Sequence, residues 1–214
     1  MSTSATLHEM FDKMLSHFGP RNWWPGETPF EVMVGAILTQ NTNWKNVEKA
    51  IINLKNADAL NPKKMLSMHD MSLASLIRPA GFFKLKTKRL KNFLKYFVEE
   101  YDADVSRMKQ KTVDELREEL LSINGIGRET ADSILLYALN KPIFVIDSYT
   151  KRILLRHNVC DEDADYNDLQ ELFMDNLPED VKHFNEYHAL IVEVGKEYCR
   201  KTPKCDSCPL KDLL

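Results

Sequence analysis

A short loop with two glycines, set between two helical patterns, constrains the fold more than any other feature of this sequence. Thr112 begins a capping box typical of a helix start, and a second stretch of helical periodicity follows Gly127. In the loop, Gly125 and Gly127 flank Ile126, and glycines so spaced let the backbone turn sharply and expose consecutive N–H groups. Such groups at a helix N-terminus suit a phosphate oxygen, although the same glycines also suit a tight turn between two packed helices.

An aspartate follows this pair of helices at the end of a short apolar run. Ile143-Phe144-Val145-Ile146 leads into Asp147, and the pattern of a further helix occupies 148–155. An aspartate in this position is the expected N-cap, stabilised as an anion by backbone N–H groups and the helix dipole. A catalytic role is compatible with the cap, because capping keeps the carboxylate ionised.

Helical periodicity also dominates the rest of the chain. Thr28-Pro29-Phe30-Glu31 combines an N-cap, a first-turn proline and a glutamate placed to close a capping box, and the apolar residues that follow predict a buried helix. The apolar run before Asp147 is too short and too isolated to imply a sheet. The sequence therefore predicts an all-α fold. Further helices are expected at 7–15, at 43–54, between Pro62 and Pro79, and in a basic segment that begins at Lys84.

Length and hydropathy limit the class of protein. A chain of 214 residues can form one large domain or two small ones that share a cleft. No apolar run approaches the roughly 18 residues of a membrane span, and the first residues lack the basic start and apolar core of a signal peptide. We therefore expect a cytoplasmic protein with no membrane partner.

The formal net charge of −3 does not indicate a nucleic-acid-binding protein, so any contact with DNA must be local. The best candidate is the segment 84–95, which has six basic residues and no acidic residue in twelve positions. Its residues Lys84, Lys86 and Lys88 are candidates for contact with the DNA backbone. The alternative is a helix face that is merely solvated.

Tryptophans and cysteines provide two further sets of candidates. Trp23 and Trp24 lie with Pro25 in a loop, where large aromatic side chains either plug a core or line a pocket, and Trp44 begins a helix beside the polar stretch 39–43. Three of the four cysteines fall within ten residues of one another, which in a cytosolic protein favours metal binding over disulfides. The fourth, Cys160, stands alone and is expected to be a packing residue. The clustered cysteines are Cys199, Cys205 and Cys208.

The segment 123–131, followed by Val145-Ile146-Asp147, resembles the helix-hairpin-helix and Gly/Pro-Asp signature of the endonuclease III superfamily of DNA glycosylases. The resemblance covers nearly the whole chain, including 30–42, the turn at 81–82 and the cysteine loop 199–208. It implies two helical domains with the active-site cleft between them. One domain would be 28–140, with the helix-hairpin-helix at about 112–140, and the other 1–27 plus 141–214.

The resemblance also implies roles for individual residues. Asp147 matches the catalytic aspartate, and Gln40 matches the glutamine that fills the gap left by a flipped base. It implies a base-excision repair enzyme bound to damaged double-stranded DNA, which we expect to be monomeric and associated with the nucleoid. The phosphate-binding hairpin would comprise Gly125, Ile126 and Gly127, with Arg128 and Thr130 as further contacts to the DNA backbone.

Glu129 departs from the family pattern, which places a lysine at this position to attack the sugar and form a Schiff base. A carboxylate cannot form a Schiff base, so we predict a monofunctional DNA N-glycosylase in which Asp147 supports attack by water and stabilises positive charge on the sugar. The tryptophans and Pro25 resemble the 3-methyladenine DNA glycosylase branch, where a damaged base is stacked between aromatic side chains. Electron-rich indole rings favour a cationic N-alkylated purine.

Two alternatives remain at this stage. One is an endonuclease III-like bifunctional enzyme that acts on oxidised pyrimidines and has AP-lyase activity. The other is a non-catalytic damaged-DNA-binding protein, against which Asp147 argues.

The cysteine loop is the second departure from the family. Its spacing, Cys199-x5-Cys205-x2-Cys208, resembles the loop that binds a [4Fe-4S] cluster, but the usual fourth cysteine would fall near Leu214. A bound cluster and an empty loop therefore both remain open.

Overall fold

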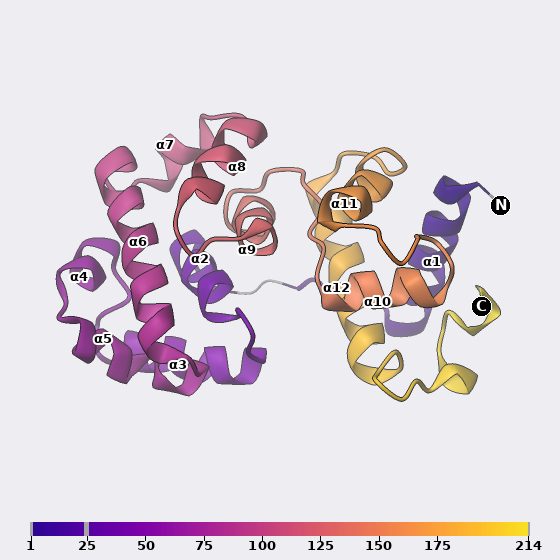
Figure 1. Ribbon diagram of the computed structural model, residues 1–214, viewed down its shortest axis with the longest axis horizontal. Coiled ribbons are helices and arrows are strands. Elements are labelled where there is room, and N and C mark those ends of the chain that lie inside the picture. Colours follow the sequence, from indigo (N-terminus) through magenta and orange to yellow (C-terminus); the bar gives the residue numbers. More distant parts are fainter. Residues whose placement is uncertain (1, 24–25, 214) are drawn as a thin grey trace. The chain divides into compact units, whose positions relative to one another are not determined.

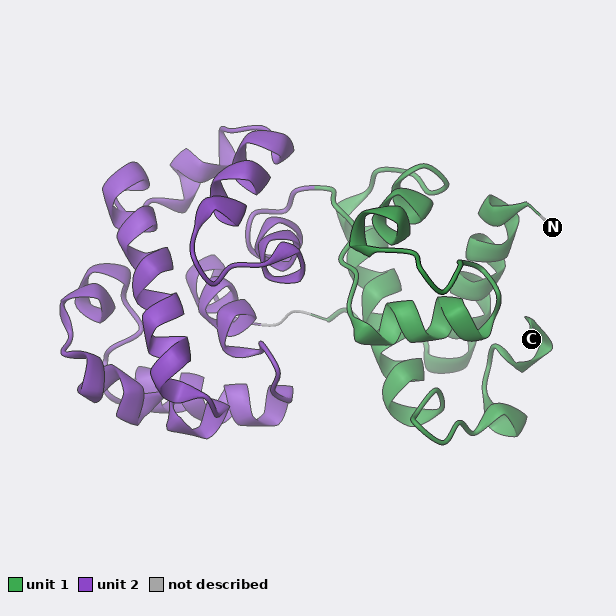
Figure 2. Cartoon of the chain, in the orientation of Figure 1, with its two compact units in different colours: residues 1–23, 142–214 green, residues 24–141 purple. Residues whose placement is uncertain are grey.

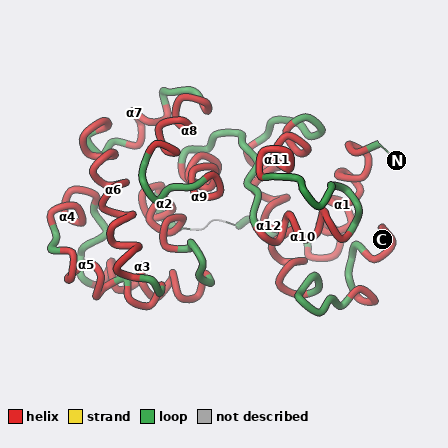
Figure 3. Tube along the Cα trace, viewed as in Figure 1, coloured by secondary structure: helices red, strands yellow, loops and turns green. Residues whose placement is uncertain are grey.

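The structure, a computed structural model, describes residues 2–23 and 26–213, and all its regular elements are helical (Figure 3). Those two ranges contain no strand, so the predicted all-α fold class is confirmed. The chain divides into two compact units (Figure 2). Unit 1 contains residues 1–23 and 142–214, and unit 2 contains residues 24–141.

Figure 1 labels the α-helices of both units. The helices of unit 2 are α2 (Pro29–Leu38), α3 (Trp44–Asn56), α4 (Pro62–Ser67), α5 (Asp70–Leu76), η1 (Arg78–Ala80), α6 (Phe83–Tyr101), α7 (Val105–Lys109), α8 (Val113–Ser122), α9 (Arg128–Ser133) and the π-helical η2 (Ile134–Ala138). Those of unit 1 are α1 (Thr3–Phe18), α10 (Ser148–Arg156), α11 (Tyr166–Met174), α12 (Val181–Glu197), η3 (Cys205–Ser207) and η4 (Lys211–Leu213).

Helix α2 is the buried helix of unit 2 and packs against α3, α6 and α9. Thr28 caps it by accepting a hydrogen bond from the Glu31 N–H at 3.1 Å, and Pro29 occupies its first turn. The Glu31 carboxylate, which the sequence predicts to close a capping box, instead pairs with Lys55 of α3 at 2.9 Å. The predicted burial is confirmed, since the apolar residues Val32, Met33, Val34, Ile37 and Leu38 are all at most 2% exposed.

Helix α6 carries the basic segment and packs against α2, α4 and α5. Its inward face is the predicted one, because Leu90, Phe93, Leu94 and Phe97 are fully buried. The ring of Phe97 stacks on Phe30 of α2 with centroids 6.1 Å apart. Aromatic contacts of this kind add to the hydrophobic stabilisation of the unit 2 core.

Two elements of unit 2 differ from the sequence prediction. The single helix expected between Pro62 and Pro79 is instead the pair α4 and α5, because Met68 is extended (ψ 147°) and His69 caps the second helix through its side chain. After α9, the chain continues as a π-helical turn, Ile134–Ala138, which helical periodicity did not indicate. All five residues of this turn are buried.

Unit 1 is built around α12, against which α1 and α10 pack. Phe144, in the extended run before α10, stacks on Phe173 of α11 with centroids 3.8 Å apart, and Tyr187 of α12 meets both rings edge-on. The Tyr187 hydroxyl donates a hydrogen bond to the Leu7 carbonyl of α1 at 2.7 Å. This contact joins the N-terminal helix to the C-terminal part of the chain.

None of the helices in the described part of the chain is both long enough and apolar enough to cross a membrane.

Candidate active site and cysteine loop

Asp147 lies at the N-terminus of α10 in unit 1. Its Oδ1 accepts two hydrogen bonds from Thr150, one from the backbone N–H at 2.8 Å and one from the hydroxyl at 2.9 Å. The preceding apolar run is buried, and the side chain of Gln170 donates a hydrogen bond to the Phe144 carbonyl within it at 2.6 Å. The segment that leads to Asp147 is therefore held in place by its burial and by this hydrogen bond.

The other carboxylate oxygen of Asp147 faces a histidine that is absent from the sequence motif. Nε2 of His188, on α12, lies 3.6 Å from Oδ2, which is longer than a hydrogen bond and within ion-pair range. The side chains of Asp147 and His188 are only 13% and 7% exposed, respectively. Burial alone would raise the pKa of Asp147, but His188 and the bonds from Thr150 outweigh burial and hold this pKa below its ordinary value. The carboxylate is therefore ionised at neutral pH.

The close approach of α10 to α12 places His188 opposite Asp147. Gly195 of α12 lies against the ring of Tyr149, where an added Cβ would come within 2.3 Å of the ring. Arg152 stacks over the same ring at 5.0 Å and donates hydrogen bonds to the carbonyls of Cys199 at 2.7 Å and Gly195 at 3.3 Å. A side chain at position 195 would push the two helices apart and move His188 away from Asp147.

The two-glycine hairpin lies in unit 2 and is fixed to α6. Gly125 has φ +98°, and an added Cβ there would be 2.4 Å from Cγ of Arg89, so this position requires glycine. Asn92 donates a hydrogen bond to the Asn124 carbonyl at 2.8 Å. An added Cβ at Gly127, in contrast, would meet no atom within 4 Å. The first glycine thus serves the fold, and the second leaves open space beside the N-terminus of α9.

Gln40, the predicted wedge residue, is hydrogen-bonded to this hairpin. Its Nε2 donates to the Gly125 carbonyl and to the hydroxyl of Thr130, both at 3.0 Å, and its Oε1 accepts from Arg89. To enter a gap in a DNA duplex, the side chain would have to break these bonds. Its wedge role stays a prediction, and in the structure Gln40 joins the end of α2 to the hairpin.

The predicted DNA-contacting lysines divide into two groups. Lys84 and Lys88 are exposed on α6, as contact with a phosphate requires. Lys86 is fully buried, and its ammonium donates hydrogen bonds to the carbonyls of Leu38 and Ala80, each at 2.7 Å. The prediction that Lys86 contacts the DNA backbone is wrong, because the alternation of basic residues along the sequence does not match the helical period, and this lysine faces inward.

Two of the four residues predicted to form the base pocket, Trp23 and Trp44, belong to the described part of the chain. Trp24 and Pro25 lie outside the described residues. Trp23 and Trp44 are half-buried, and the indole N–H of Trp44 donates a hydrogen bond to Glu48 at 3.1 Å. The ring of Trp44 lies against Gly35 of α2, where an added Cβ would be 3.2 Å from it. Both described tryptophans therefore keep part of their surface exposed.

The first turn of α9 contains Arg128 and Glu129, both exposed, whereas Thr130 and Ile126 are buried. Glu129, which the family resemblance matches to a lysine, follows Gly127 by two positions. The hairpin residues and Asp147 belong to different units.

Sequence reasoning missed two residues of functional interest. His188 lies in an apolar stretch of α12, where nothing in the local pattern distinguishes it from a core histidine. Phe82 has a left-handed conformation (φ 44°) at the start of α6, and its side chain is 66% exposed. The glycine before it signals a turn, but only the structure shows that Phe82 is exposed to solvent.

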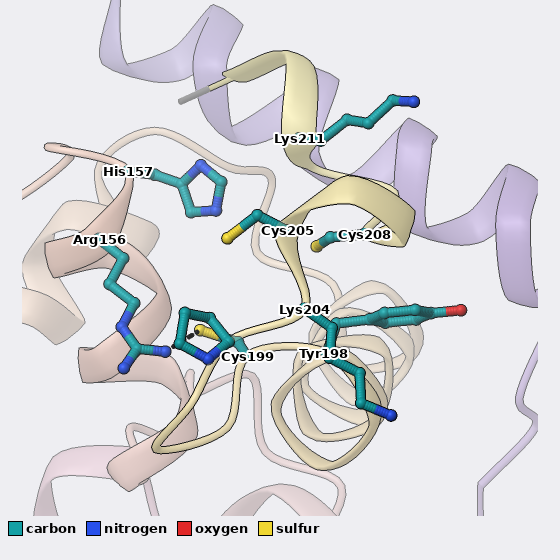
Figure 4. A pocket seen from close by; sticks show the side chains of 9 residues that line it. Arg156, His157, Tyr198, Cys199, Lys204, Cys205, Cys208 and Lys211 are labelled. Atoms are coloured by element: carbon teal, nitrogen blue, oxygen red, sulfur yellow. Dashed lines mark hydrogen bonds between the residues drawn. The ribbon is translucent and has the colours of Figure 1, made fainter.

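The three clustered cysteines line one pocket of unit 1, together with His157, at the end of α10 (Figure 4). None of them forms a disulfide. Arg156 donates hydrogen bonds to Sγ of Cys199 at 3.3 Å and to the Arg200 carbonyl at 2.6 Å. The loop is therefore held against α10, and its three cysteines line one pocket.

The three cysteines do not form a site for a single metal ion. Among the described residues, no three His, Cys, Asp or Glu side chains converge on a point that one ion could occupy. A cluster does not require such convergence, because each thiolate binds a different iron and the ligands surround a volume. Three unpaired thiols around one pocket fit that requirement, with one ligand still to be supplied.

Comparison with known proteins gives consistent results. Residues 34–179 match the HhH-GPD superfamily base excision DNA repair protein family. A protein of Methanocaldococcus jannaschii, named provisionally as a DNA repair glycosylase, is 53% identical over 209 residues, which cover 97% of this chain and 94% of the relative. Endonuclease III of Thermotoga maritima is 28% identical over 207 residues, covering 96% of this chain and 91% of that protein.

A solved structure, that of H. pylori 3-methyladenine DNA glycosylase bound to 1,N6-ethenoadenine, is similar to this chain with a TM-score of 0.77. It is 30% identical, and the match covers 92% of this chain and 98% of that one. The family match spans more than half of the sequence and includes both the hairpin and Asp147. The chain belongs to the HhH-GPD superfamily of base excision DNA repair proteins, and it is a DNA glycosylase of the endonuclease III superfamily.

Proposed function

We propose that this DNA glycosylase is monofunctional and hydrolyses the N-glycosidic bond of N-alkylated purines, 3-methyladenine above all, in duplex DNA. The observation that carries the proposal is the environment of Asp147. A carboxylate that is 13% exposed, bonded twice by Thr150 and faced by His188, is held ionised at neutral pH. An ionised carboxylate beside the sugar stabilises the positive charge that develops as the base departs.

Three residues of this chain contribute to the chemistry. Asp147 stabilises the developing charge on the sugar and orients the attacking water, whose proton it accepts. His188 and Thr150 position that carboxylate. The N-alkylated purine carries positive charge and leaves readily, so strong protonation of the leaving base is unnecessary.

Glu129 supports the absence of lyase activity. It lies in the first turn of α9, where the family lysine would provide the amine, and a carboxylate cannot form a Schiff base with the sugar. Strand cleavage through that route is therefore closed. The negative charge of Glu129 also favours a cationic base over a neutral one.

Two features support the substrate class. Trp23 and Trp44 are both partly exposed, and an indole face attracts a cationic purine more strongly than a neutral one. The H. pylori relative, which is 30% identical, is named for 3-methyladenine and was solved with a modified adenine bound. We also assign Trp24 and Pro25 to the base pocket, on the family resemblance alone.

DNA binding is proposed to use the hairpin and the start of α6. Backbone N–H groups beside Gly127 suit a phosphate, and Arg128, Lys84 and Lys88 are exposed cations. The exposed ring of Phe82 is suited to insert between bases, as apolar wedges do in proteins that distort DNA.

We also propose that Cys199, Cys205 and Cys208 hold a [4Fe-4S] cluster. When bound, the cluster would cross-link the C-terminal loop and stabilise its fold, with no part in hydrolysis. Arg156, which already donates a hydrogen bond to Cys199, would also stabilise its thiolate.

A base-release assay with parallel borohydride trapping tests the function. Methylated duplex DNA should release free 3-methyladenine, and borohydride should trap no covalent protein–DNA adduct. Asp147→Asn should lower release by about 1,000-fold while DNA binding is retained. Duplexes with oxidised pyrimidines serve as the comparison. Excision of oxidised pyrimidines with adduct formation, in place of 3-methyladenine release, would establish the bifunctional alternative, which similarity to endonuclease III of Thermotoga maritima favours.

A further inference from the structure

The cysteine pocket has a fourth potential ligand that does not come from the cysteine loop. His157 is the residue after α10 and lines the same pocket as Cys199, Cys205 and Cys208. Figure 4 shows its imidazole on the side of the pocket where Sγ of Cys205 points. Position 214, six residues after Cys208, is leucine, so residues 199–214 contain three cysteines.

The imidazole of His157 is oriented as a metal-binding histidine is. Its Nδ1 lies 3.2 Å from the Leu213 carbonyl. A carbonyl oxygen can only accept a hydrogen bond, so Nδ1 carries the proton and Nε2 keeps its lone pair. Histidines that bind metals commonly donate their other ring N–H to a backbone carbonyl, which fixes both the tautomer and the ring orientation.

The charges around the pocket are compatible with an anionic cluster. Arg156, Lys204 and Lys211 line it together with the sulfur ligands. A cluster held by three thiolates and a neutral imidazole carries one negative charge fewer than a cluster held by four thiolates. Replacement of cysteine by histidine raises the reduction potential of iron–sulfur centres, because a neutral ligand replaces an anion.

We propose that Nε2 of His157 is the fourth ligand of the cluster, in place of the cysteine that the family pattern has at position 214. This inference rests on the proposed cluster and is independent of the glycosylase activity. It assigns a role to a side chain that neither the helix-hairpin-helix nor the cysteine spacing includes. The end of α10 is bonded to the segment that contains these cysteines at two points, through Arg156 to Cys199 and through His157 to Leu213.

The direct test is pulsed electron paramagnetic resonance on the full chain, purified without oxygen, with its histidines labelled with nitrogen-15. After one-electron reduction of the cluster, the wild-type protein should show hyperfine coupling to one directly bound nitrogen. His157→Cys should retain iron and sulfide, lose the nitrogen coupling and have a lower reduction potential, because a thiolate replaces the neutral ligand. His157→Ala should lose about a quarter of its iron or more, because one iron then lacks a protein ligand.

Two substitutions serve as matched controls. His8, like His157, has its Nδ1 bonded to a backbone carbonyl, that of Ser4 at 2.7 Å, but it does not line the pocket. His8→Ala should therefore leave both iron content and nitrogen coupling unchanged. Cys160→Ser should likewise leave iron content unchanged, whereas Cys205→Ser should lower it.

The outcomes distinguish three proposals: that His157 is a ligand, that the protein holds a cluster, and that it is a glycosylase. A reduced cluster without nitrogen coupling in the wild-type protein overturns the assignment of His157 and leaves the cluster standing. Nitrogen coupling that persists in His157→Ala also overturns it. Wild-type protein with no iron or sulfide overturns both the cluster and its ligand. Base release, measured on the same preparations, tests the glycosylase separately.

Discussion

A buried carboxylate can act as a stable charge only if its surroundings oppose the cost of its burial. At Asp147 two residues offset this cost: Thr150, on the helix that Asp147 caps, and His188, on α12. The N-cap geometry is local and would exist in any protein with this helix start. The contact with His188 exists only because two helices pack closely, with Gly195 against Tyr149.

His188→Gln should lower the rate of base release by about 10- to 100-fold, the equivalent of one contact to a charged group. His188 lowers the pKa of Asp147, so its removal should raise that pKa and move the acid limb of the pH–rate profile to higher pH. Single-turnover rates measured across pH provide the test. A lowered rate with an unmoved acid limb would reduce His188 to a packing residue.

The burial of Lys86 should make the stability of the folded protein depend on pH. Burial, and then the charge of Arg89, lower the pKa of Lys86 from 10.5 to about 8. Between these values the unfolded chain binds a proton that the folded chain has released, so the free energy of unfolding should rise with pH over this window. In Lys86→Met this rise should disappear. The protein should also lose about 2–3 kcal/mol at neutral pH, because two buried carbonyls lose their donor.

Urea unfolding of the wild type and of Lys86→Met at several pH values from neutral to 10.5 measures both effects. Lys88→Met, on the exposed face of α6, is the control and should leave stability unchanged. Equal pH dependence in all three proteins would contradict the assignment of the effect to Lys86.

At the scale of elements, the two glycines of the hairpin have different roles: we expect Gly125 to serve folding and Gly127 to serve DNA binding. Gly125→Ala should destabilise unit 2 by about 2–4 kcal/mol, because φ is +98° and the added methyl group meets Arg89. Gly127→Ala should cost less than about 1 kcal/mol, since its φ is negative and the space beside it is open. It should nevertheless weaken DNA binding about tenfold, because the methyl group occupies the space proposed for a phosphate.

Thermal unfolding and DNA titrations of the two variants provide the comparison. Gly127→Ala should lose less thermal stability than Gly125→Ala and yet bind DNA more weakly than the wild type. If Gly127→Ala bound DNA as tightly as the wild type, the hairpin would be a tight turn between packed helices and nothing more.

At the scale of the whole molecule, the proposed cluster belongs to unit 1 alone. Cys199 is joined to α10 through Arg152 and Arg156, and to α12 by its backbone N–H, which donates to the Val194 carbonyl at 2.8 Å. Helices α8 and α9 belong to unit 2. Removal of iron by a chelator should therefore increase hydrogen exchange in the loop 199–208, in α10 and in α12. Exchange in α8 and α9 should not change.

Hydrogen exchange followed by mass spectrometry, before and after chelation, measures this directly. Equal loss of protection in both units would mean that the two unfold cooperatively. No change anywhere would mean that the loop keeps its fold without metal.

The sequence by itself determined the features that depend on short stretches of chain. Capping at Thr28 and Thr112, the inward face of α6, the buried character of α2 and the N-cap at Asp147 all follow from local spacing, and the structure has each of them. The family signature is likewise local, since it consists of a hairpin and an aspartate a short distance apart in the chain. These features need no knowledge of distant residues.

Only the tertiary structure decided which distant side chains meet. Nε2 of His188 lies 3.6 Å from Oδ2 of Asp147, although the two residues are far apart in the sequence. His157 likewise lines a pocket with cysteines that are distant from it in the sequence, the first of them Cys199. Lys86 faces the core, where its ammonium binds the carbonyls at the ends of α2 and η1. The sequence does not indicate this, because Lys86 lies among other basic residues. The physical reason is the same in each case: helical periodicity fixes the face on which a residue lies, and packing alone fixes what that face touches.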